Sequence, residues 1–150
     1  MKILLFLAKG FETMEASVFI DVIGWAGNDY KMDLEVITCG KTGTVISAFG
    51  VPVTVDALLH EINASDYDAL ALGHAGILFG KKATTYHLGD GRRQKQLEET
   101  GAEVVNEPVV ITDNIITSYC PQTAPEVAFS LLEMLVGPRD MLIVKKAMGF

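Results

Sequence analysis

An apolar run near the start of the chain, residues 3–7, constrains the fold more than any other feature of the sequence. Consecutive apolar side chains over such a short stretch are typical of a strand buried on both faces of a parallel sheet. The run breaks at Gly10, and apolar residues at helical spacing follow from Met14 to Trp25. Ligands of parallel sheets bind at the carboxyl ends of the strands. We therefore expect Glu15, at the start of this helix, to lie where a site would form.

The remainder of the chain continues this alternation and predicts a single domain over residues 1–150. The predicted strands are residues 33–38, 44–46, 51–55, 68–72, 82–86, 108–111 and 114–117, and the later helices are residues 90–100, 123–136 and 140–147. The last two strands are expected to pair as a hairpin. Because neither a repeat nor a linker interrupts this order, we expect one layered α/β fold.

The acidic composition argues against several classes of partner. The chain has 12 Lys and Arg against 19 Asp and Glu, a formal charge of -7, which repels phosphate backbones and anionic lipid surfaces. Its apolar start is shorter than the core of a signal peptide, and no stretch reaches the roughly 20 apolar residues of a membrane span. We therefore expect a soluble, cytoplasmic protein that binds neither nucleic acid nor membrane.

The sequence offers little support for a cofactor or a metal. Residues 40–42, Gly-Lys-Thr, resemble the end of a phosphate-binding loop, but the glycine required five positions earlier is replaced by Glu35. Gly10 stands alone where a dinucleotide-binding loop needs a series of glycines. The three histidines, His60, His74 and His87, lack metal-ligand spacing. We predict that the protein uses no cofactor and no metal ion.

Of the two cysteines, Cys120 is the candidate for chemistry. It lies between a predicted strand and a predicted helix whose first turn contains Pro121, so free backbone N–H groups and the helix dipole would favour its thiolate. The alternative is an unreactive, small, buried residue, which is the commoner role of a free cysteine. We expect Cys39, at the end of a predicted strand, to be inert.

Glu12 and Glu15 are three residues apart, which would place them on one face of the first helix. Acidic residues in a first turn interact favourably with the helix dipole, and this explains both without any further function. Alternatively, Glu15 faces the end of the sheet, is partly desolvated, and shares a proton with a thiolate. Composition and spacing leave both interpretations open.

Three stretches resemble the DJ-1/ThiJ/PfpI family, which includes 4-methyl-5-(beta-hydroxyethyl)thiazole monophosphate biosynthesis-like proteins. Residues 7–16, LAKGFETMEA, are similar to the opening of that family, and residues 82–86 and 114–123 are similar to its closing part. The resemblance implies a flavodoxin-like (class I glutamine amidotransferase-like) three-layer sandwich with a mostly parallel sheet. It also implies a homodimer and a reactive cysteine on a strained elbow between a strand and a helix.

The resemblance also implies a site. In the family pattern, the glutamate matched by Glu15 hydrogen-bonds the elbow cysteine, and the loop matched by residues 118–123 closes the pocket. The expected substrate-binding residues are Gly10, Glu12, Tyr86, His87, Tyr119, Gln122 and Thr123. Two features depart from the family: the closing loop lacks the usual Arg-Gly-Pro-Gly-Thr pattern, and Tyr86 stands where a histidine often follows paired threonines.

A larger departure is a deletion at residues 72–77. Family members insert a helix, a strand and the cysteine elbow here, on the order of thirty to fifty residues, whereas only Gly73 and His74 separate Leu72 from Ala75 in this chain. Without that internal crossover the family nucleophile is missing, and Cys120 is the candidate to replace it. Neighbouring strands would have unpaired edges unless the sheet closes or another chain pairs with them.

Two functions are consistent with these features. The first is a cysteine-dependent enzyme acting on small carbonyl compounds or glycated groups, glyoxalase- or deglycase-like, weak because the elbow cysteine is missing. The second is a non-catalytic stress-response protein, redox-sensing or chaperone-like, in which Cys120 is oxidised. Whether the chain is an enzyme stays open at this point. In the first case, the partner is a small-molecule substrate.

Overall fold

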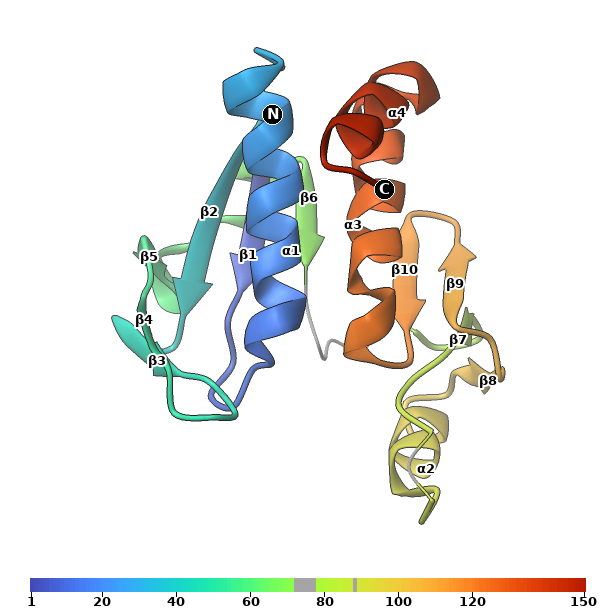
Figure 1. Ribbon diagram of the computed structural model, residues 1–150. Coiled ribbons are helices and arrows are strands. Elements are labelled where there is room, and N and C mark those ends of the chain that lie inside the picture. Colours follow the sequence, from blue (N-terminus) through green and yellow to red (C-terminus); the bar gives the residue numbers. More distant parts are fainter. Residues whose placement is uncertain (72–77, 88) are drawn as a thin grey trace.

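The computed structural model describes residues 1–71, 78–87 and 89–150. Its centre is a parallel sheet of four strands in the order β5-β2-β1-β6 (Figure 1). The strands are β1 (Lys2–Phe6), β2 (Glu35–Gly40), β5 (Ala57–Leu58) and β6 (Ala69–Ala71). The apolar run at the start of the chain is thus an inner strand, paired with β2 on one side and β6 on the other.

The longer helices pack together over one face of this sheet. They are α1 (Thr13–Gly24), which continues into the π-helical turn η1 (Trp25–Asp29), α3 (Ala124–Val136) and α4 (Pro138–Ala147). Helix α1 packs against α3, and α3 against α4. The core between sheet and helices contains Ile3, Val22, Ile23, Ala128, Phe129, Leu132 and Val144. Burial of these apolar side chains is the main force that holds the helices on the sheet.

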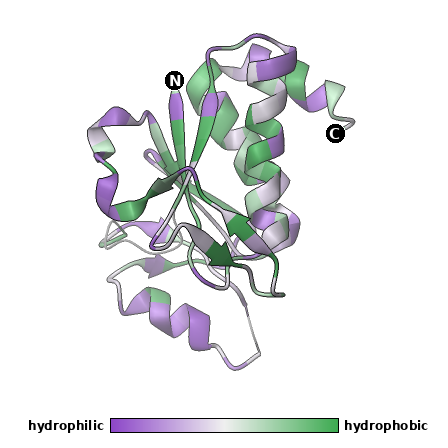
Figure 2. Cartoon of the chain, turned by 90° about the vertical axis from the view of Figure 1, so that its left-hand side faces the viewer, coloured by the Kyte–Doolittle hydropathy of each residue, from purple (hydrophilic) through white to green (hydrophobic). Residues whose placement is uncertain are grey.

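Three two-stranded sheets complete the strands. The hairpin of β3 (Thr44–Ile46) and β4 (Pro52–Thr54) and the hairpin of β9 (Val109–Thr112) and β10 (Ile115–Ser118) are antiparallel, whereas β7 (Lys82–Ala83) and β8 (Glu103–Val104) are parallel. The remaining elements are α2 (Arg92–Glu98) and the 3-10 turns η2 (Leu59–Glu61), η3 (Ala64–Asp66) and η4 (Pro121–Thr123). Figure 2 shows α2 as mostly hydrophilic and the parallel strands as hydrophobic.

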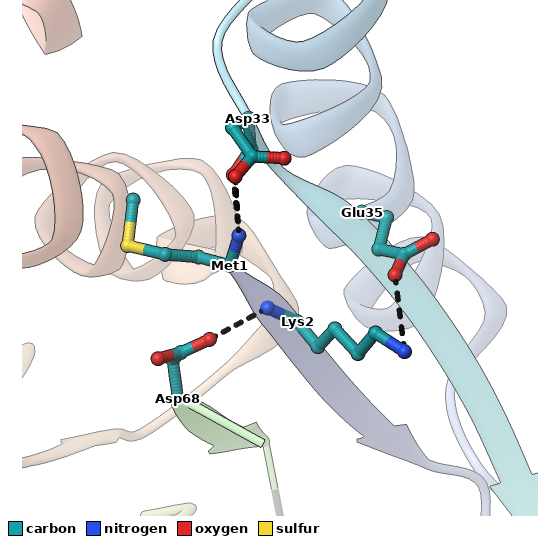
Figure 3. Close-up of polar contacts among 5 residues, drawn as sticks. All are labelled: Met1, Lys2, Asp33, Glu35 and Asp68. Atoms are coloured by element: carbon teal, nitrogen blue, oxygen red, sulfur yellow. Dashed lines mark hydrogen bonds and ion pairs between the residues drawn. The ribbon is translucent and has the colours of Figure 1, made fainter. Parts of the chain in front are cut away.

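Polar contacts at the amino end of the parallel sheet fix its register (Figure 3). The backbone nitrogen of Lys2 donates to Oδ2 of Asp68 at 2.8 Å, and the nitrogen of Met1 donates to the carbonyl oxygen of Asp33 at 2.6 Å. The ammonium of Lys2 lies 3.6 Å from Oε1 of Glu35. These contacts lie at the opposite end of β1 from the turn that leads to Glu15, so they serve the fold rather than the candidate site.

The predicted elements are present with shifted bounds, and three of these shifts concern the candidate site. Helix α1 begins at Thr13, so Glu12 precedes it and is not in its first turn as predicted. The strand expected at residues 82–86 ends at Ala83, because beyond it the backbone nitrogen of Thr84 donates to the side chain of Thr117. Helix α3 begins at Ala124, after η4, rather than at Thr123. The predicted deletion at 72–77 lies outside the described residues.

The described strands form two groups that do not pair with each other. Strand β6 is at an edge of the parallel sheet, and β10 pairs with β9 alone among the described residues. In Figure 1, β6 stands on the α1 side and β10 on the α3 side. The side chain of Leu70 in β6 is 48% exposed, and the buried hydroxyl of Thr84 has no hydrogen-bond partner among the described residues. Among the described strands, β6 therefore pairs with β1 alone.

Candidate functional site

A hydrogen bond between Glu15 and Tyr86 forms the centre of the candidate site. The hydroxyl of Tyr86 donates to Oε1 of Glu15 at 2.6 Å, and both side chains are partly buried. Glu15 is in the first turn of α1, where its negative charge interacts favourably with the helix dipole. Tyr86 follows β7, so the bond joins residues 71 positions apart in the sequence.

The turn before α1 places Glu15 at the carboxyl end of the sheet. Gly10 has a φ of 82°, a conformation that residues with a Cβ rarely adopt, and the chain reverses there after β1. The backbone nitrogen of Gly10 donates to the carbonyl oxygen of Ile46 at 2.8 Å, which ties the turn to β3. Gly10 therefore has a structural role next to Glu15, and its predicted contact with substrate stays a prediction.

Tyr86 keeps its proton in this environment. Burial raises the pKa of Tyr86 well above its usual range, and the hydrogen bond to Glu15 raises it further. The charges of Glu15, Glu12 and Cys120 add smaller contributions in the same direction, so all three carboxylate or thiol groups lie within electrostatic range of the phenol. Helix α1, the segment after β7 and the end of β10 thus meet around Tyr86.

Cys120 lies between β10 and η4 with extended backbone. The hydroxyl of Thr123 donates to the carbonyl oxygen of Cys120 at 2.7 Å and closes this 3-10 turn. The predicted helical turn at Pro121 is the 3-10 turn η4, and α3 begins directly after it at Ala124. Because a helix dipole acts within about one turn, the dipole of α3 affects Cys120 less than expected. The side chain of Cys120 is partly exposed.

Cys39 differs from Cys120 in both burial and ionisation. Its side chain is 0% exposed, at the end of β2. Burial raises the pKa of the Cys39 thiol, which favours the uncharged and unreactive form. These observations support the expectation that Cys39 is inert.

The other predicted site residues lie in different environments. The rings of His87 and Tyr119 pack with centroids 5.3 Å apart and planes tilted by 59°. Gln122 is exposed, whereas Thr123 is buried and its hydroxyl is used within η4. Glu12 lies at the start of α1 and contributes charge near Tyr86.

Two surface depressions lie beside α2. One has a volume of about 270 Å³ and is lined by His87, Gln94, Glu98, Val104, Val105 and Asn106, so it reaches the predicted set through His87. The other, of about 410 Å³, is lined by Asp90, Arg92, Lys95, Gln96 and Glu99, none of which was predicted to bind substrate. Both border the polar surface of α2.

The described residues contain neither a cluster of metal-binding side chains nor a membrane-spanning helix. Across the described ranges of the chain, no group of three or more His, Cys, Asp or Glu side chains is arranged to hold a metal ion. Among the helices within those ranges, none has the length and apolar character needed to cross a bilayer.

Comparison with known proteins identifies the family. The sequence model of the DJ-1/PfpI family matches residues 1–73 and, separately, residues 69–134. The chain belongs to the DJ-1/PfpI family. Two curated relatives from Arabidopsis thaliana, Protein DJ-1 homolog A and Protein DJ-1 homolog B, are each 27% identical over 90% and 91% of this chain. These matches cover 43% and 38% of the relatives, so the chain spans about two fifths of their length.

Solved structures confirm the flavodoxin-like fold. Drosophila melanogaster DJ-1beta superposes with a TM-score of 0.81 at 23% identity, covering 98% of this chain and 96% of that one. Schizosaccharomyces pombe DJ-1 gives 0.79 at 21% identity, covering 100% of both chains. An AraC family transcriptional regulator from Pseudomonas putida gives 0.80 at 14% identity, covering 99% of both chains, so the DJ-1/PfpI fold also occurs in a regulator.

Sequence reasoning placed Glu15 and Tyr86 in one pocket but missed that they bond to each other. Tyr86 was predicted to contact substrate, and the partner predicted for Glu15 was a cysteine. The available signal was the replacement of a common family histidine by tyrosine, whose longer side chain carries a hydroxyl donor. The structure assigns that donor to Glu15.

Proposed function

We propose that this DJ-1/PfpI-family protein acts on small carbonyl compounds or glycated groups, and that its glyoxalase- or deglycase-like chemistry depends on Glu15 and Cys120. The observation that carries the proposal is the hydrogen bond between Tyr86 and Glu15, together with the electrostatic effect of Cys120 on Tyr86. A carboxylate near a partly exposed thiol is a recurrent arrangement for covalent catalysis. His87, Tyr119 and Gln122 supply further polar contacts for the substrate.

Methylglyoxal illustrates the chemistry. The Cys120 sulfur forms a bond to the aldehyde carbon, the carbonyl π electrons move to oxygen, and Glu15 transfers the thiol proton to that oxygen. The proton on this carbon then moves to the neighbouring ketone carbon by way of an enediol. The hydroxyl proton moves to the ketone oxygen, and the product is a thioester. Water then releases lactate and restores the thiol. No outside oxidant or reductant is needed.

The proposal includes a missing crossover at residues 72–77, and it predicts slow turnover. The family model matches the chain in two pieces, which overlap at residues 69–73. The alignment with DJ-1 homolog A spans 176 positions, but it contains only about 135 residues of this chain, which is 90% of 150. About 41 positions of that relative thus have no residue opposite them. Among the described strands, β6 pairs with β1 alone, which supports a gap at the same place. Without an elbow, Cys120 lacks a rigid nucleophile geometry, which lowers the rate.

Methylglyoxal loss by purified variants tests the enzyme proposal. Cys120→Ser should abolish turnover, and Glu15→Gln should lower kcat by about 100-fold or more, the usual effect of losing a general acid or base. Cys39→Ala is the matched control, because Cys39 is the other cysteine of the chain and is buried outside the site. Turnover that survives in Cys120→Ser would contradict the proposal.

The difference between the two cysteines favours one alternative, a non-catalytic redox sensor in stress response. Cys120 is partly exposed and Cys39 is fully buried, so an oxidant should reach Cys120 first. If the protein is such a sensor, intact mass and peptide mapping after peroxide treatment should show oxidation of Cys120. The turnover assay should then show no consumption of methylglyoxal by the wild type or by any variant. Oxidation of Cys39 before Cys120 would exclude this function.

A homodimer and a cytoplasmic location complete the proposal. Exposed apolar side chains lie near the start of α1 and at the β3–β4 hairpin, namely Met14, Ile46, Phe49 and Val51. Backbone hydrogen bonds connect the hairpin to the turn before α1. For example, the nitrogen of Ala48 donates to the carbonyl oxygen of Phe11 at 2.9 Å. Contiguous exposed apolar surface favours contact with a partner. Sedimentation of the wild type and of Phe49→Asp should show a dimer that dissociates in the variant, and a wild-type monomer would refute it.

A further inference from the structure

The hydrogen bond from Tyr86 to Glu15 bridges the two groups of strands. Glu15 belongs to α1, which lies over the parallel sheet, whereas Tyr86 follows β7, which packs against β9 (Figure 1). The described strands of these two groups do not pair with each other. The side-chain hydrogen bond therefore connects two parts of the fold that no ladder between described strands connects. At 2.6 Å, with a charged acceptor, it is of the stronger kind.

The bond also restricts the protonation of both partners. A phenol can donate only while it keeps its proton, and a carboxylate accepts most strongly when it is ionised. Burial and the neighbouring Glu15 raise the pKa of Tyr86, so the phenol stays protonated through the pH range in which an ordinary thiol ionises. The Tyr86 hydroxyl therefore remains a hydrogen-bond donor to Oε1 of Glu15 through this pH range.

We propose that Tyr86 is a positioning residue that fixes the Glu15 carboxylate relative to Cys120, and thereby sets the pH range in which the Cys120 thiol reacts. This inference rests on the proposed function, because it assigns Tyr86 to the same thiol site. It replaces the predicted role of Tyr86 in substrate contact by a role that acts through Glu15. Tyr86 touches the carboxylate rather than the reacting carbonyl.

The two partners should have opposite effects on the thiol when each is changed. Tyr86→Phe removes the donor, so the full charge of Glu15 acts on its surroundings and disfavours a second negative charge on Cys120. Glu15→Gln removes the negative charge and favours the thiolate. A purely structural loosening of the site would shift both variants in the same direction.

Alkylation of Cys120 by iodoacetamide, followed across pH by peptide mass, measures this effect. In Tyr86→Phe the midpoint of the profile should rise by about half a pH unit or more, which is about a threefold lower rate on the rising limb. In Glu15→Gln the midpoint should fall. Tyr30→Phe is the control, since Tyr30 is 38% exposed and follows η1, outside the site. A Tyr86→Phe profile equal to the wild type would overturn the proposal.

Tyrosinate absorbance across alkaline pH tests the bond itself without any reaction at Cys120. One tyrosine of the wild type should ionise later than the others, and it should ionise earlier in Glu15→Gln. If Tyr86→Phe does not fold, this comparison decides the question. No late tyrosine, or one unaffected by Glu15→Gln, would overturn the proposal. If both Cys120→Ser and Glu15→Gln keep full turnover, the proposed enzyme function is wrong. The alkylation and absorbance measurements would still test the role of Tyr86.

Discussion

At the scale of single residues, Thr38 and Asp56 show how a surface carboxylate can stabilise this fold. The hydroxyl and the backbone nitrogen of Thr38 donate to Oδ2 of Asp56 at 2.6 and 2.8 Å, which fixes the chain just before β5. Hydrogen bonds from the side chain and then the backbone of Thr38 lower the pKa of Asp56. The carboxylate form is thus the one that stabilises β2 and its neighbour.

Asp56→Asn should lower the free energy of unfolding by about 1 kcal/mol at neutral pH, a modest value because the site is exposed. Since the pKa of Asp56 is lower in the folded state, its contribution is present above the ordinary Asp range and is lost as pH falls through the folded value. The difference between variant and wild type should therefore vanish in acid. Urea unfolding from pH 7 down to about pH 1.5 measures it, with Asp21→Asn as the exposed control. A difference that does not shrink as the pH falls below the ordinary Asp range would contradict this role.

At the scale of elements, Leu4 and Leu70 are register partners in β1 and β6, but their surroundings differ. Leu4 is 3% exposed and Leu70 is 48% exposed. Leu4→Ala should cost about 2–5 kcal/mol of unfolding free energy, as is usual for a buried leucine. Leu70→Thr, which preserves strand propensity, should cost less than about 1 kcal/mol. Chemical denaturation compares the two, and equal costs would show that β6 is covered by further structure.

The elements themselves were largely predictable, and their ends were not. Apolar alternation and helical spacing predicted β1, the β9–β10 hairpin, the separate strands β3 and β4 and the three long helices, since these patterns reflect burial on one face. The start of α3 was missed because Thr123 closes a 3-10 turn on Cys120, a local bond that spacing does not reveal. The bond from Tyr86 to Glu15 was missed for a related reason: sequence separation of 71 residues carries no information on which side chains meet.

At the scale of the whole molecule, the contact between α1 and α3 joins the two groups of described strands. Helices α1 and α3 pack over the region where β6 and β10 fail to pair, and their shared core includes Ile3, Val22 and Leu132. Family membership and fold could be recognised from the sequence because the two matching blocks are in the expected order. The contact of α1 with α3 joins the two groups of described strands in a fold that superposes on Drosophila melanogaster DJ-1beta with a TM-score of 0.81.

Peptide mass mapping of the protein isolated from its native cells tests the missing crossover most directly. Residues 42–81 contain no Lys or Arg before Lys81, so trypsin should release them as one peptide that spans the joint. We predict this peptide at the mass of the printed sequence, in a protein in which Glu15 bonds to Tyr86 and Cys120 is the reactive thiol. Additional peptides between Leu72 and Ala75 would contradict this, because they would come from the crossover that the proposed site lacks.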